Sequence, residues 1–199
     1  MKQYVFNGVV RFKKIGPLEL GDARNKVMRW FFSYPAKEIS LNDLTRSVNV
    51  SKSTANKVVM QLAKEGFLKI QPLGKVWRIS CDQKHSYNST KKVSHNLELI
   101  YDTQIVAGVL SKVPNARSII LFGSYRKGDD NENSDIDIAV EIVGGGDVQM
   151  TTLGIIPMLD YRKNVKVNAL LFSRNRIDLN LFANLVNGIV LYGFLEARP

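Results

Sequence analysis

The feature that most constrains the fold is the stretch ILFGSYRKGDDNENSDIDIAV at residues 120–140. An apolar run leads directly into Gly123 and Ser124, a polar segment follows, and a second apolar run contains Asp135 and Asp137. Because side chains at i and i+2 of a strand share a face, these two aspartates project together while the isoleucines that alternate with them face the core. The pattern predicts two buried strands, joined by a polar loop, with two acids on one face.

Two neighbouring carboxylates repel each other and raise each other's pKa unless a cation lies between them. Mg²⁺ suits such a site, because proteins usually hold it with one or two carboxylates plus substrate phosphates. Gly123 permits close backbone approach, and the N–H groups and Ser124 hydroxyl can hydrogen-bond phosphate oxygens. The stretch therefore predicts a site for a metal-bound nucleotide.

The segment GSYRKGDDNENSDIDIAV resembles the G-S…D-x-D signature of the polymerase beta nucleotidyltransferase superfamily, and its small, minimal members most of all. The resemblance implies that Gly123 and Ser124 hold the phosphates of a nucleoside triphosphate. It also implies that Asp135 and Asp137 are catalytic and bind two Mg²⁺ (or Mn²⁺) ions. The implied reaction is in-line attack on the α-phosphate, which transfers a nucleoside monophosphate to an acceptor. Many small members carry Arg in G-S-x-A-R-G where this chain has G-S-Y-R-K-G, so either Arg126 or Lys127 could contact the nucleotide.

The chain departs from this family at the third carboxylate, which active members usually carry on a later strand. The corresponding strand is predicted at residues 164–172, where Lys166 or Asn168 takes the place of the acid. Asn168 could offer a metal one oxygen, but it cannot act as a base. Other acids that could substitute lie farther along the strand or in neighbouring segments: Glu141, Asp147 and Asp160.

The rest of the C-terminal half is predicted as scaffold. We expect one long helix over residues 93–112, a helix or irregular crossover over 148–161, and a helix over 174–186 capped by Ser173. The two histidines, His85 and His95, have no clustered ligand neighbours, so a histidine metal site is not expected.

The N-terminal half is strongly basic. Residues 1–92 hold 18 Lys/Arg against 6 Asp/Glu, a balance of +12, whereas residues 93–199 have a balance of −2. Residues 21–81 predict helix, short strand, helix, turn, helix and hairpin, and this order resembles a winged helix-turn-helix domain. Residues 1–20 are predicted to add a strand or two.

The third helix of that unit carries the candidate nucleic-acid contacts, because this helix lies in the major groove in DNA-binding helix-turn-helix domains. The hairpin, or wing, adds Lys75. The alternative is a protein-binding module whose lysines are only solvated. The candidate residues of the helix are Ser51, Lys52, Ser53, Thr54, Asn56 and Lys57.

The predicted fold class is α+β. It comprises an N-terminal winged helix-turn-helix unit with an extension (residues 1–81), a linker (82–92) and a nucleotidyltransferase-type α/β domain with a small mixed sheet flanked by helices (93–199). No signal peptide or membrane span is expected, which predicts a cytoplasmic protein. The single cysteine, Cys81, is expected to be a partly buried free thiol.

Three functions fit this reading. The first is a Mg²⁺-dependent nucleotidyltransferase that a winged helix targets to DNA. The second is a transcriptional regulator whose nucleotidyltransferase domain senses nucleotide or is catalytically silent. The third is an antitoxin-like protein that modifies or caps another protein. A homodimer or a protein partner could complete the site.

Overall fold

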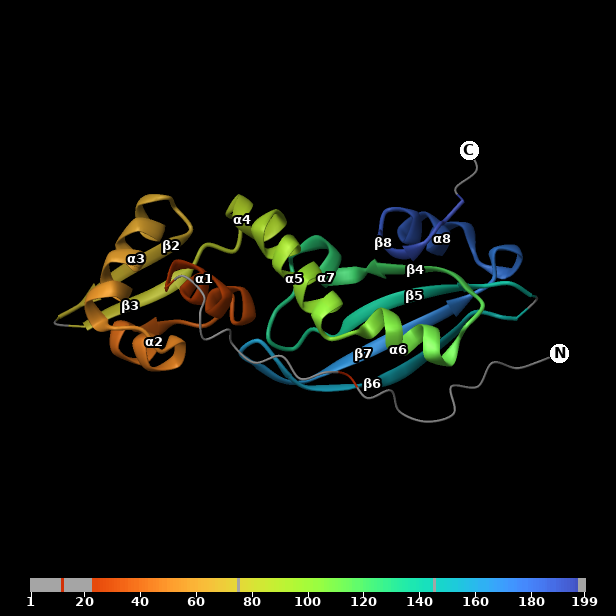
Figure 1. Cartoon of the computed structure of the whole chain (residues 1–199). Helices are drawn as coiled ribbons and strands as arrows, with labels where there is room; N and C mark the ends of the chain where they lie inside the picture. Colours follow the sequence, from red (N-terminus) through yellow and green to blue (C-terminus); the bar gives the residue numbers. More distant parts are fainter. Residues whose placement is uncertain (1–11, 13–22, 75, 145, 197–199) are drawn as a thin grey trace.

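The computed structural model describes residue 12 and residues 23–74, 76–144 and 146–196. The predicted strands within residues 1–20 therefore lie outside the described residues, apart from the buried Phe12. The described chain forms two groups of elements at opposite ends of an elongated molecule (Figure 1). We call them the N-terminal unit (residues 23–81) and the C-terminal unit (residues 86–196).

The N-terminal unit contains three helices and a three-stranded antiparallel sheet. The helices are α1 (Ala23–Ser33), α2 (Leu41–Val48) and α3 (Lys52–Lys64), and the strands are β1 (Ile39–Ser40), β2 (Leu68–Leu73) and β3 (Val76–Cys81). The strand order is β1-β3-β2. Each predicted element of residues 21–81 is present, in the predicted order.

Local sequence explains where these helices begin. Ser40 accepts a hydrogen bond from the backbone N–H of Asp43, and Ser51 accepts one from that of Thr54, so each serine caps a helix. The helices and the sheet enclose one core, in which Phe31, Leu44 and Phe67 are fully buried. Cys81 belongs to this core as a free thiol, and burial raises its pKa to about 11.

Three helices connect the sheets: α4 (Ser86–Ser89), α5 (Lys91–Asp102) and α6 (Ile105–Lys112). The short α4 lies within the predicted linker. The prediction of one unbroken helix over residues 93–112 was wrong, because Gln104 adopts a left-handed conformation with φ 60°. The Thr103 hydroxyl also donates to the carbonyls of Leu99 and Ile100 at the end of α5.

The C-terminal unit is built on a five-stranded sheet, which is mixed, as predicted. Its strands are β4 (Ala116–Phe122), β5 (Ile136–Ile142), β6 (Gln149–Leu159), β7 (Arg162–Phe172) and β8 (Ile189–Gly193), in the order β6-β7-β5-β4-β8. The ladder between β5 and β7 is parallel, and the other pairings are antiparallel. The short helix α7 (Gly123–Lys127) follows β4 directly.

Helices cover the two faces of this sheet unequally. Ile136, Ile138 and Val140 of β5 pack with α5 and α6 on one face, which confirms the predicted core side of that strand. On the opposite face, Ala139 and Leu170 pack in a smaller cluster with α8 (Leu179–Val186). Because residues alternate along a strand, Asp137 and Asn168 share this second face, beyond the part that packs with α8.

Two further predictions for the scaffold were wrong. The segment 148–161 contains the long strand β6 and the turn after it rather than a helix or a crossover, because β6 pairs with β7 as an antiparallel hairpin. The helix expected over residues 174–186 is divided into a 3₁₀ turn, η1 (Arg174–Arg176), and α8. Asp178 caps α8 through the backbone N–H groups of Asn180 and Leu181, whereas Ser173 makes no capping bond to η1.

Candidate functional site

The parallel ladder between β5 and β7 brings three polar side chains together. Asp137 pairs with Asn168 in this ladder, and Asp135 immediately precedes β5. The Asn168 Nδ2 group donates to Asp135 Oδ2 and to Asp137 Oδ1, at 3.3 Å in each case. All three side chains are half-buried. Of the two residues predicted for this position, Asn168 is therefore the one that lies across from both acids.

The amide of Asn168 has a defined orientation. Its Oδ1 accepts a hydrogen bond of 3.1 Å from the hydroxyl of Thr152 on β6, so the nitrogen faces the acids. A hydroxyl both donates and accepts, which means that Thr152 could also pair with Nδ2 if the amide turned over. In the present orientation Asn168 acts towards the carboxylates as a neutral hydrogen-bond donor.

The electrostatics of the pair fit a site for a cation. Burial raises the pKa of Asp137 above its ordinary value, and the charge of Asp135 raises it further. The hydrogen bond from Asn168 acts in the opposite direction. One neutral amide only partly compensates two carboxylates, whereas a divalent cation would compensate both.

Gly123 packs directly against Asp137. It has φ +73°, and a Cβ atom there would lie 2.9 Å from Asp137 Oδ2. Such a conformation and such a close approach both favour glycine. Gly123 and Ser124 open α7 at the end of β4, whose last residue, Phe122, pairs with Asp137. The structure thus places the Gly-Ser pair beside the acids.

Side chains of α5 hold the loop between these motifs, and these contacts were not predicted from the sequence. Asp130 is buried and accepts from Asn96 Nδ2 at 2.8 Å, and the buried ammonium of Lys92 lies 3.3 Å from its other oxygen. Lys92 Nζ also donates to the Asp130 carbonyl, and Asn96 donates to the Tyr125 carbonyl at 3.0 Å. Burial raises the pKa of Asp130 and lowers that of Lys92.

The other candidate acids are engaged elsewhere. Glu141 is buried, forms an ion pair with Arg174 at 3.1 Å and accepts from the Ser118 hydroxyl. Asp160 is buried beside His95 at 3.0 Å. The exposed Asp147 lies 3.5 Å from Arg176. Each of these contacts accounts for its carboxylate without reference to Asp135 and Asp137.

Three basic residues were predicted near this site: Arg126, Lys127 and Lys166. Arg126 is half-buried and Lys127 exposed, both near the end of α7. Within the described ranges, neither makes an ion pair with a carboxylate. Lys166 is exposed and pairs across the hairpin with Ile155, so Asn168 rather than Lys166 occupies the position opposite the acids.

A comparison with protein families agrees with this geometry. Residues 103–190 match the family model described as a nucleotidyltransferase domain. The match begins at the end of α5 and runs into β8, so it includes the Gly-Ser pair, both aspartates and Asn168. It covers less than half of the chain and supports a nucleotidyltransferase domain in the C-terminal unit. No curated protein matches the chain.

The C-terminal unit offers a divalent metal only a small set of ligands. In the part of the chain that the structure describes, no cluster of three or more His, Cys, Asp or Glu side chains could hold a metal ion. The available set consists of Asp135, Asp137 and, after a half-turn of its amide, Asn168. A nucleotide's phosphates would have to supply further ligands.

The candidate nucleic-acid contacts lie together on the N-terminal unit. The six residues from Ser51 to Lys57, apart from Ala55, are exposed at the start of α3. The Ser51 hydroxyl lies 3.1 Å from that of Ser53 and 2.8 Å from that of Thr54. Lys75 lies outside the described residues. None of the described helices is long and apolar enough to cross a bilayer.

Proposed function

We propose that the chain transfers a nucleoside monophosphate from a Mg²⁺-bound nucleoside triphosphate to an acceptor hydroxyl. The observation that carries this proposal is the convergence of Asp135, Asp137 and Gly123 on one face of the sheet. The family match over the same residues supports nucleotidyl transfer in general terms.

Each group has a role in this proposal. Gly123 and Ser124 hold the phosphates, because glycine lets the backbone approach and the hydroxyl can donate. Arg126 or Lys127 adds positive charge beside them. Asp135 and Asp137 hold the metal, which when bound neutralises charge on the leaving pyrophosphate. In the transfer, the acceptor oxygen bonds to the α-phosphorus, the bond to the bridging oxygen breaks, and the hydroxyl proton is released.

The test is incubation of the protein with labelled nucleoside triphosphates, Mg²⁺ or Mn²⁺ and cell extract. We expect labelled macromolecule or released pyrophosphate from the wild type, and none from Asp135→Ala or Asp137→Ala. Asp147→Ala is the matched control, because it removes an exposed carboxylate of the same unit. Equal turnover in all four proteins would contradict the proposal.

A second function is favoured by one observation, the amide of Asn168 at the position opposite the acids. An amide cannot accept the proton of the acceptor hydroxyl, and its nitrogen faces both carboxylates. The alternative is therefore a nucleotide-sensing regulator that binds nucleotide and metal without turnover. Metal-dependent nucleotide binding that requires Asp135 and Asp137, with no product in the transfer assay, would select this function.

We further propose that the N-terminal unit is a winged helix that binds DNA. Its helix–strand–helix–helix–hairpin order supports this reading, as do the exposed polar and basic residues at the start of α3. In this arrangement α3 enters the major groove, where Lys52 and Lys57 meet phosphates and Ser53, Thr54 and Asn56 meet phosphates or base edges.

DNA affinity should fall steeply with salt, because lysine contacts release counterions from the phosphate backbone. We expect Lys52→Glu plus Lys57→Glu to weaken binding of duplex DNA and to reduce the salt slope by about 2. The control is Lys84→Glu plus Lys163→Glu, which makes the same change of charge at two exposed lysines away from α3. Equal affinity of the two double variants for duplex DNA would contradict the proposal.

A further inference from the structure

Arg162 opens β7 directly after the turn between β6 and β7, and its side chain is buried with 6% exposure. One guanidinium nitrogen donates to the Tyr125 hydroxyl at 2.5 Å, and the other terminal nitrogen donates to the carbonyl of Ser134. Tyr125 follows Ser124, and Ser134 precedes Asp135. One planar group therefore ties together the two ends of the loop that joins the Gly-Ser pair to the acids.

The burial of this cation calls for an explanation. Among the residues that the structure describes, no carboxylate forms an ion pair with Arg162, and its Nε has no hydrogen-bond partner. Removing a charge from water is costly unless the group is paired or well bonded. Both of its acceptors, the Tyr125 hydroxyl and the Ser134 carbonyl, are neutral. Replacing buried ionic groups by apolar side chains of similar volume is often neutral or stabilising, so the burial of Arg162 motivates a role beyond stability.

We propose that Arg162 is a positioning residue of the nucleotide site. It sets the separation between Ser124 and the pair formed by Asp135 and Asp137, and thereby the affinity for a metal-bound nucleoside triphosphate. Lysine cannot reproduce this function, because an ammonium lacks the planar fork that reaches two acceptors at fixed angles. The inference rests on the proposed function, since it concerns the same nucleotide.

The turn that carries Arg162 is also held by the N-terminal unit. The hydroxyl of Tyr34, which directly follows α1, donates to the Tyr161 carbonyl at 2.6 Å. Asp160 lies 3.0 Å from His95 on α5, whose other ring nitrogen is 3.4 Å from Glu98. The position of Arg162 thus depends on helices of both units.

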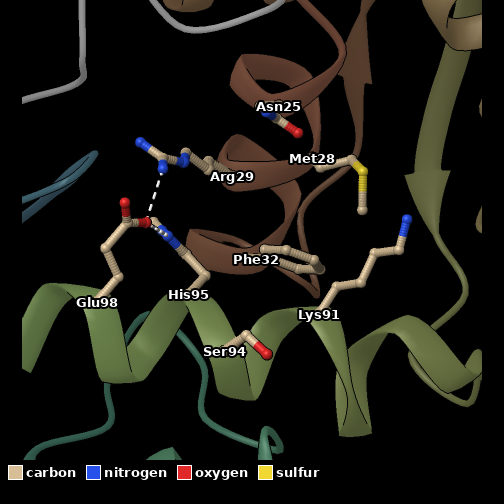
Figure 2. Close-up of a pocket in the computed structure, with 8 residues that line it drawn as sticks. All are labelled: Asn25, Met28, Arg29, Phe32, Lys91, Ser94, His95 and Glu98. Atoms are coloured by element: carbon tan, nitrogen blue, oxygen red, sulfur yellow. Dashed lines mark hydrogen bonds and ion pairs between the residues drawn. The ribbon is translucent and has the colours of Figure 1, made fainter.

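Figure 2 shows the end of this chain of contacts at a groove between α1 and α5. Arg29 of α1 donates to Glu98 at 2.8 Å, and His95 reaches the same carboxylate from within α5. The groove has a volume of about 520 Å³. A shift of α1 at this groove would displace the same turn and, through it, Arg162. Tyr34→Phe removes the hydrogen bond to the Tyr161 carbonyl but none of the bonds of Arg162 itself. We therefore expect it to weaken nucleotide binding less than changes at Arg162 or Tyr125.

The test compares two variants with a matched control in equilibrium binding of a non-hydrolysable nucleoside triphosphate with Mg²⁺. Arg162→Lys keeps the charge, and Tyr125→Phe removes one acceptor while keeping the buried ring. We expect each to weaken binding about 10- to 100-fold, as for other residues that orient metal ligands. Tyr161→Phe loses only a 3.5 Å contact to the Lys26 carbonyl in the same turn, and should stay within about twofold.

Thermal unfolding of each variant separates positioning from a purely structural role. If Tyr125→Phe lowers Tm while the folded protein binds nucleotide like the wild type, the proposal is overturned, and Arg162 serves stability alone. Wild-type affinity in both variants, with binding lost in Asp137→Ala, would overturn it and leave the proposed function intact. A wild type that binds no nucleotide would overturn both.

Discussion

Replacing Asn168 with aspartate tests the geometry of the acid pair most directly. The amide nitrogen lies 3.3 Å from an oxygen of each aspartate. Asn168→Asp therefore adds a third carboxylate, with one of its oxygens at about the same separations from the other two. In a water-like medium each such contact costs about 1.3 kcal/mol, and the two together about 2.5 kcal/mol. The upper limit of the cost is about 4 kcal/mol, because that is what it takes to protonate a carboxyl of ordinary pKa at pH 7. A stronger repulsion would be relieved by the uptake of one proton.

These limits predict that Asn168→Asp lowers the free energy of unfolding by about 2.5–4 kcal/mol at pH 7 without metal. For a chain of this size the change corresponds to a drop in Tm of about 5–16 °C. Saturating Mg²⁺ should recover most of the loss, because it binds the folded state preferentially and pairs with the added charge. Wild type should respond less to Mg²⁺ in the same assay.

The pH dependence has a defined sign. Burial and like charges raise the pKa of Asp137 in the folded protein, so the unfavourable charge is fully present above that raised pKa. The repulsion is relieved as the pH falls through that raised pKa, because Asp137 then takes up a proton in the folded protein. The difference in Tm between variant and wild type should therefore narrow as the pH is lowered from 7.

Asn168→Ala is the control for this experiment, because it removes the amide without adding charge. Because the alanine variant also loses the hydrogen bonds of the amide, an aspartate variant less stable than the alanine variant reports the repulsion. If Asn168→Asp and Asn168→Ala unfold at the same temperature in chelator at pH 7, Asn168 does not face the acids and the reasoning fails.

Two other predictions concern stability. Gly128→Ala should lower the free energy of unfolding by at least about 2 kcal/mol, because Gly128 has φ +79° and a Cβ atom would lie 1.8 Å from the Asn88 carbonyl oxygen; an unchanged midpoint in urea would contradict the close packing of α7 on α4. Glu65→Gln should make the free energy of unfolding fall less as the pH is lowered, because in the wild type the paired Arg24 guanidinium lowers the pKa of Glu65 to about 2. That pair stabilises the fold at pH above about 4.3, and its contribution is lost as pH falls towards 2. Because the pair is partly exposed, the loss of unfolding free energy between pH 7 and pH 2.5, measured in urea melts, should differ by at most about 1 kcal/mol between wild type and variant.

The acid pair was predictable because its signal is local. Alternation along β5 separates Asp137 from the buried Ile136 and Ile138, and any register that buries the isoleucines exposes the acids together. Alternation along β7 predicted either Lys166 or Asn168 opposite the acids, and the pairing of Asp137 with Asn168 decides between them. The long strand β6 was not. It is an edge strand that contains Gly154 at a register shift and Pro157, and only its pairing with β7 makes it a strand.

Arg162 escaped sequence reasoning for a different reason. Nothing at residue 162 distinguishes a buried guanidinium from an exposed one, because its partners, Tyr125 and Ser134, are distant in sequence. The break between α5 and α6 was equally hidden. Gln104 adopts its left-handed conformation without the glycine or proline that would have marked it.

The parallel ladder between β5 and β7 has a consequence for how the molecule opens. It joins two hairpin-like halves, β4–β5 and β6–β7, each of which has its own antiparallel pairing. The acids belong to one half, and Asn168 and Thr152 belong to the other. A fluctuation that parts the two halves would dismantle the site while leaving both antiparallel ladders protected. In hydrogen exchange, the amides between β5 and β7 should therefore report the integrity of the site more directly than those of any other ladder in the sheet.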